Sequence, residues 1–79
     1  MSTNSEDKLI TLISRWLGRH IGNADLRREI GVIGSDGLAP EQLEALHELV
    51  AELDRAEPGQ RGHLEMVARE TLESLALHG

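Results

Sequence analysis

A glutamate and a histidine stand three residues apart in a segment with helical spacing. Glu44 and His47 have the Glu-x-x-His spacing that places a carboxylate and an imidazole on one metal ion in di-iron four-helix proteins. Such a site needs the pair on an inward face and a second copy of the motif. On a helical wheel Glu44 projects about 160° from Leu46 and His47 about 100°, so both point outward or sideways. No second motif follows, and we expect no metal site.

The other histidines offer no catalytic arrangement. His63, Glu65 and Glu70 have no serine or cysteine nucleophile beside them, so their spacing indicates neither a triad nor an acid–base pair. His20 falls inside an apolar arc if the first helix continues beyond Gly18, and we then expect a core histidine with one bonded nitrogen, or else a proton switch. The sequence therefore predicts that the protein is not an enzyme and holds no cofactor.

Three glycines are spaced by three residues in the middle of the chain. Gly31, Gly34 and Gly37 do not form a phosphate loop, because no Lys-Ser/Thr follows them and no strand precedes them. Asp36-Gly37 resembles part of a calcium loop, but Leu43 stands where the bidentate glutamate would be needed. We interpret this stretch as a turn-rich loop.

Charge is unevenly distributed along the chain. The net charge is −6, with five Lys or Arg against four Asp or Glu in residues 1–33 and three against ten in residues 34–79. An acidic half repels phosphate backbones and acidic lipid surfaces, so we expect neither nucleic acid nor a membrane as the main partner. The same half attracts a basic patch on another protein, or the basic half of a second copy.

Composition limits the class of protein. The 79 residues correspond to one domain that buries only about 60% of its unfolded surface, and association often compensates for so small a core. The chain has no cysteine, which excludes a disulfide framework and favours the cytoplasm. Apolar runs are short, so we expect neither a signal peptide nor a membrane span. With Trp16 as the one aromatic residue, no platform for stacking single-stranded nucleic acid exists.

A DNA-binding regulator is an alternative. Residues 24–30 and 40–56 would be the two helices of a helix-turn-helix, but the loop between them is long and Glu41, Glu44 and Glu48 would face phosphate. Such binding would use the arginines of the first half, namely Arg15, Arg19, Arg27 and Arg28.

The stretch from Leu9 to Ile21 is the expected centre of the fold. Its apolar residues cover an arc of roughly 180°, wider than the ~100° stripe of an ordinary surface helix, so neighbours are needed on two sides. The residues of this arc are Leu9, Ile10, Leu12, Ile13, Trp16, Leu17 and Ile21.

The remaining segments predict amphipathic covers for that helix. We expect residues 1–4 to be disordered and residues 5–78 to form one helical domain, an all-α four-helix bundle with orthogonal or irregular packing. The first helix is capped by Asn4 or Ser5 and runs through Leu17 or on to Gly22. A short helix from Ala24 to Ile30 is capped by Asn23 and ended by Gly31, and the following loop inserts Val32 and Ile33 into the core. The longer helices span about 40–56, with Pro40 at the first position, and 60–77, with a break at 57–59.

Two surfaces are candidates for interaction. Met66 and Leu77 fall on the outer face of the last helix with Val67 at the flank, and exposed apolar residues on one face can form a contact patch. An acidic wall lines the third helix opposite its leucines. We predict a non-catalytic protein–protein interaction module, such as a small adaptor, regulator or antitoxin-like accessory protein, that docks through helix faces and forms a homodimer. The acidic wall consists of Glu41, Glu44, Glu48 and Glu52.

A second alternative comes from a family resemblance. The size, the acidity, the scarcity of aromatics and the order of helix, long loop and acidic helix resemble an acyl or peptidyl carrier protein. In that family an Asp-Ser-Leu motif presents the serine that takes a phosphopantetheine arm. The sequence Gly34-Ser35-Asp36-Gly37-Leu38 stands at the corresponding place, with the acid after the serine instead of before it. The resemblance implies Ser35 as the attachment site and the acidic helix as the docking face for basic enzymes.

Overall fold

The protein consists of four α-helices. A computed structural model describes residues 4–57 and 60–77, and within these ranges the helices are α1 (Ser5–Leu17), α2 (Asn23–Ile33), α3 (Pro40–Arg55) and α4 (Gly62–Leu77). The all-α, four-helix prediction is confirmed. Of residues 1–4, which were predicted to be disordered, Asn4 is described and caps α1, since its side chain accepts from the Asp7 amide at 2.9 Å. Residues 1–3 and the Pro58-Gly59 break lie outside the described residues.

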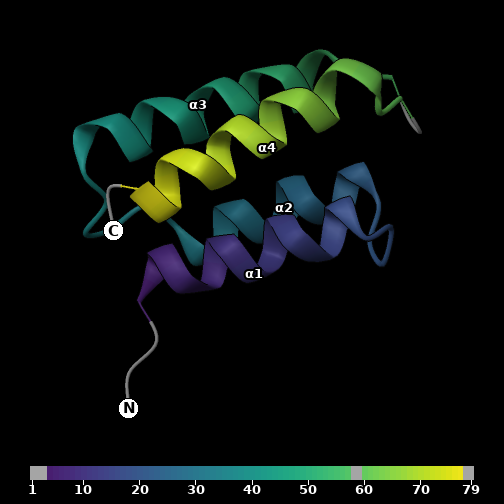
Figure 1. Cartoon of the computed structure of the whole chain (residues 1–79). Coiled ribbons are helices and arrows are strands. Elements are labelled where there is room, and N and C mark those ends of the chain that lie inside the picture. Colours follow the sequence, from purple (N-terminus) through teal and green to yellow (C-terminus); the bar gives the residue numbers. More distant parts are fainter. Residues whose placement is uncertain (1–3, 58–59, 78–79) are drawn as a thin grey trace.

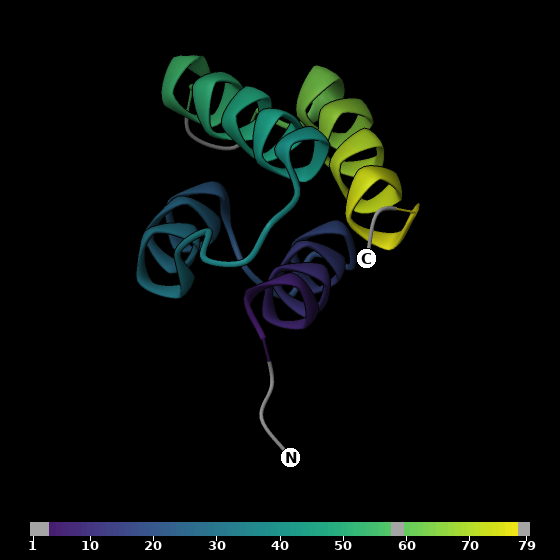
Figure 2. The same ribbon diagram turned by 90° about the vertical axis from the view of Figure 1, so that its left-hand side faces the viewer.

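The helices are arranged as two hairpins, α1–α2 and α3–α4, that lie against each other (Figure 1). Each helix packs against two others, in the ring α1, α2, α3, α4, so that α1 and α3 are diagonally opposed (Figure 2). The turns of both hairpins lie at one end of the bundle. This arrangement stacks the acidic second half of the chain on the nearly neutral first half.

The apolar arc of α1 occupies the centre, as predicted. Leu9, Ile13 and Trp16 are fully buried, while Ile10 and Leu17 pack at the edge of the core. Because the arc is wide, α1 contacts both α2 and α4. The other helices contribute apolar stripes with helical spacing, which are Leu26 and Ile30 of α2, Leu46, Leu49 and Leu53 of α3, and Leu64, Val67, Ala68 and Leu75 of α4.

Helix α1 ends at Leu17, the first of the two ends predicted for it, so the condition for a core histidine at position 20 is not met. Arg19 adopts a left-handed φ of 65°, and the amides of Arg19 and His20 donate to the carbonyls of Trp16 and Arg15. These two bonds form the Schellman arrangement that closes a helix. The chain therefore turns before His20 can reach the apolar arc, and its side chain is exposed, close to Gly18.

Helix α2 continues three residues beyond its predicted end. Gly31 lies inside it, and Gly34, with a φ of 79°, follows the last turn. The prediction that Val32 and Ile33 both enter the core is wrong for Val32, which is 73% exposed. Because adjacent residues of a helix lie about 100° apart, only one of the two can face the core, and Ile33 does so.

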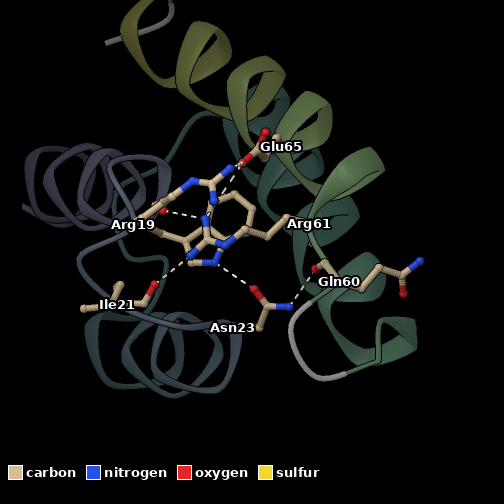
Figure 3. A network of polar contacts seen from close by, with 7 residues as sticks. Arg19, Ile21, Asn23, Gln60, Arg61 and Glu65 are labelled. Atoms are coloured by element: carbon tan, nitrogen blue, oxygen red, sulfur yellow. Dashed lines mark hydrogen bonds and ion pairs between the residues drawn. The ribbon is translucent and has the colours of Figure 1, made fainter.

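A cluster of polar contacts around Arg61 joins the two hairpin turns (Figure 3). We call this cluster, Arg61 with Trp16, Asn23 and Gln60, the Arg61 clasp. The Arg61 guanidinium lies 4.3 Å from the centre of the Trp16 ring and donates to the carbonyls of Trp16 and Ile21, at 2.7 and 2.9 Å. Asn23 accepts from the Trp16 indole and donates to the Gln60 carbonyl, each at 2.8 Å. Gly22 is consequently the N-cap residue of α2, and the prediction of Asn23 as cap is wrong.

A buried glutamine joins the helices at the opposite end. Gln42 is 1% exposed, and its amide nitrogen donates to the Leu75 carbonyl at 3.0 Å and to the Glu6 carboxylate at 3.2 Å. Its amide oxygen accepts from the backbone of Ala39 at 2.7 Å. One side chain thereby links α1, α3 and α4, and it satisfies the backbone amide of the N-cap residue Ala39, as the side chain at the third helical position does in a capping box.

Candidate interaction surfaces

The outer face of α4 carries two large apolar side chains. Met66 is 52% and Leu77 72% exposed, and a separation of eleven residues places them on one face, three turns apart. Val67 does not belong to this face, because it is only 9% exposed and packs into the core. Its predicted place in the interaction surface is wrong for a geometric reason, since it lies about 100° from Met66 on the wheel.

Charged residues separate the two apolar positions. Arg69, Glu70 and Glu73 are exposed on the turns between Met66 and Leu77. None of the three forms an ion pair with another described residue. We call this surface, Met66, Arg69, Glu70, Glu73 and Leu77, the α4 face.

Three of the four predicted acidic residues are exposed along α3. Glu41, Glu44 and Glu48 project outward and have no ion-pair partner within residues 4–57 and 60–77. Glu52 differs, since it is half-buried beside α4, 2.6 Å from the Arg55 guanidinium and 3.8 Å from the His63 ring. The free acidic row is therefore Glu41, Glu44 and Glu48, and Glu52 belongs to the contact between α3 and α4.

A shallow hollow of about 440 Å³ lies beside this acidic row. Glu44 and His47 both point out of the bundle into it, as the sequence indicated, and the described residues contain no cluster of three metal-ligating side chains. Apolar side chains complete the surface. The hollow is lined by Pro40, Leu43, Glu44, His47, Glu48 and Ala51.

A groove that the sequence analysis did not predict lies between α1 and α2. Its volume is about 360 Å³ and its floor is formed by Leu12 and Ile33. Lys8 and Arg15 line it from α1 and Glu29 from α2. We call it the α1–α2 groove. Both helices were predicted, but the pairing of their outer edges is a tertiary feature.

Most arginines of the first half of the chain form ion pairs with carboxylates. Arg27 lies 2.9 Å from Asp54, Arg28 lies 2.9 Å from Asp25, and Arg19 lies 3.9 Å from Glu65. Among the described residues Arg15 has no such partner. Since paired arginines present less positive potential to a phosphate backbone, this arrangement does not favour a DNA interface.

Ser35 lies in the connection between α2 and α3. It is exposed and five residues before the first residue of α3, and Gly34 and Gly37 on either side adopt positive φ. The serine is therefore accessible, but it is not at the start of the acidic helix where the carrier-protein resemblance implies it.

Comparison of the chain with protein-family models, with curated proteins and with solved structures finds no match. In the described part of the chain, no helix has the length and apolar character needed to cross a bilayer. The surfaces described above are therefore the features of the molecule that bear on its function.

Proposed function

We propose that the protein is a non-catalytic protein–protein interaction module that self-associates through the α4 face. The observation that carries this proposal is the exposure of Met66 and Leu77 on one side of a single helix. A domain of this size has a small core, and burying two large apolar side chains adds about 1.5–3 kcal/mol for each. A regulator or adaptor that works by docking helices needs no other chemistry.

An antiparallel pairing of two α4 helices suits the order of residues on this face. About a two-fold axis midway between the two apolar positions, Met66 of each copy meets Leu77 of the other. The same axis places Glu70 of each copy opposite Glu73 of the other, and Arg69, which meets Ser74, lies one position away and offsets the repulsion between these carboxylates. A parallel pairing would place Arg69, Glu70 and Glu73 each beside the same residue of the other copy, so that Arg69 would add a repulsion of its own instead of offsetting that of the glutamates.

Molar mass measured by light scattering over a concentration series tests the proposal. In about 0.5 M NaCl, which screens contacts between exposed charges, we expect a dimer for the wild type and a monomer for the Met66→Glu, Leu77→Glu double variant, because two buried carboxylates without partners oppose association. The matched control is Ala24→Glu with Ser35→Glu, which adds the same charge at exposed positions away from α4 and should leave the dimer intact. Circular dichroism verifies that each variant is folded.

A wild type that is monomeric at all concentrations up to about 1 mM contradicts self-association through this face. An equal loss of the dimer in the control variant does so too, because the cause is then net charge and not the apolar contact.

A further inference from the structure

The α1–α2 groove combines an apolar floor with basic residues on one side. Lys8 and Arg15 are exposed on α1, seven residues apart, which is about 10 Å along the helix axis. Neither has an ion-pair partner among the described residues. Leu12 lies between them at the floor, and the exposed Val32 follows on α2 next to Ile33. A ligand for this groove needs two acids with that spacing and apolar side chains beside them.

The acidic row of α3 has these properties. Glu41 and Glu48 are also seven residues apart on one face of a helix, so the distance between them along the axis is the same, about 10 Å. Leu43 and Ala51 provide apolar surface at the side of the row. The two features are thus complementary in charge, in spacing and in the presence of apolar surface.

Within one chain the two surfaces cannot meet. Helices α1 and α3 are diagonally opposed and do not pack side by side (Figure 2), and the hydrogen bond between them comes from the buried side chain of Gln42 and not from the exposed row. A row that satisfies the groove must therefore come from another molecule. Because net charge is −6 and is concentrated on α3 and α4, a second copy approaching with its α3 toward the first half of its neighbour also meets the least repulsion.

We propose that the α1–α2 groove of one copy binds the acidic α3 row of a second copy. The contact is heterologous, so a pair of copies leaves one groove and one row open, and association continues head to tail. Glu29, which lines the α2 side, lies 3.9 Å from Arg28, and this pairing reduces its repulsion of the incoming row. This interface is separate from the α4 face, and neither requires the other.

Charge reversal on each side tests the contact. All variants are made in the Met66→Glu, Leu77→Glu background, so that the result does not depend on the α4 face. One variant reverses the row with Glu41→Lys and Glu48→Lys, and the other reverses the groove with Lys8→Glu and Arg15→Glu. Sedimentation velocity over a concentration series measures association, and circular dichroism verifies folding.

We expect the background protein to associate, and the association constant to fall by about tenfold or more in either reversed variant and between about 0.05 M and about 0.5 M NaCl. Mixing the two reversed variants should restore association, because each then offers the charge that the other lacks. A single chain with all four reversals should associate as well.

The control variant Glu70→Lys with Glu73→Lys makes the same change of net charge as the row variant and should leave association intact. The proposal is overturned if the mixture of the two reversed variants sediments as species no heavier than those of each variant alone. It is also overturned if the background protein stays monomeric up to about 1 mM. Because the α4 face is inactivated throughout, either result leaves the proposed function to be decided by its own experiment.

Discussion

The two ends of the bundle are held by different kinds of polar contact. At the end with the hairpin turns, Arg61 stacks on Trp16 and binds two carbonyls, and its side chain is 19% exposed. At the opposite end Gln42 is neutral, 1% exposed, and bonded to Glu6, Leu75 and Ala39. If Arg61 is removed, water can reach the groups to which it was bonded. If Gln42 is removed, water cannot reach all of its partners.

Solvent access and formal charge predict opposite orders for the loss of stability when each of these two polar side chains is removed. Hydrogen bonds to charged groups are stronger than neutral ones, so charge alone predicts that removing Arg61 lowers stability more than removing Gln42. Buried polar groups without a partner lose their full solvation, so burial predicts that removing Gln42 lowers stability more than removing Arg61. Substitutions at the two ends separate these two orders.

The largest expected effect is that of Gln42→Leu. The free energy of unfolding should fall by about 3 kcal/mol, because the Ala39 amide and the Leu75 carbonyl lose a partner in a buried place. Urea titration followed by circular dichroism measures it. Thr71→Val is the matched control, since the Thr71 hydroxyl donates to backbone carbonyls of Ala45 and Val67 and should cost only about 1 kcal/mol.

A smaller loss, about 2 kcal/mol, is expected for Arg61→Ala, through the two carbonyl bonds and the stacked ring. Arg61→Lys should recover about half of it, because an ammonium keeps the charge but not the planar fork. Equilibrium unfolding in urea gives both values. If Arg61→Ala lowers the free energy of unfolding more than Gln42→Leu does, charge and not burial determines which of the two side chains contributes more to stability.

The turn after α1 should become more stable when its left-handed residue is replaced. Arg19→Gly should raise the free energy of unfolding by about 0.5–1 kcal/mol, because glycine adopts positive φ without a Cβ penalty. Arg19→Ala keeps the penalty and loses the contact with Glu65, so it should lower stability slightly. Thermal unfolding of the two variants side by side separates backbone strain from the ion pair.

The smallest effect is expected between α2 and α3. Arg27 and Asp54 lie 2.9 Å apart, but both are exposed, and Arg27→Ala should cost about 0.5 kcal/mol or less because solvent screens the pair. A double-mutant cycle with Asp54→Ala measures the coupling. A coupling above about 1 kcal/mol would show that exposure is a poor guide to these contacts.

The helices could be predicted from local patterns. The wide apolar arc of α1, the leucine spacing of α3 and Pro40 at its first position give helices whose bounds agree closely with the structure. Met66 and Leu77 were placed on the outer face by their helical angle alone. These features depend on residues within a few turns of one another, so the sequence carries them directly.

Positions at helix ends were predicted less well. A core position of His20 was predicted only if α1 continued beyond Gly18, and both ends of the helix stayed open because the pattern does not reveal that Arg19 adopts a left-handed conformation, which glycine usually supplies. Val67 was placed at the flank of the outer face and Glu52 in the acidic wall, but Val67 is buried in the core and Glu52 lies beside Arg55 of its own helix and His63 of α4. Both positions lie near the boundary of a helical face, where the packing angle of the neighbour decides exposure.

The sequence by itself determined the fold class, four amphipathic helices and the division of charge between the two halves of the chain. Only the tertiary structure decided that Arg61 reaches over Trp16, that Gln42 is buried between three helices, and that α1 and α2 form a basic groove diagonally opposite the acidic row. The physical reason is distance along the chain. Helical periodicity acts over a few residues, whereas these contacts join residues more than thirty positions apart or depend on how two helices pair.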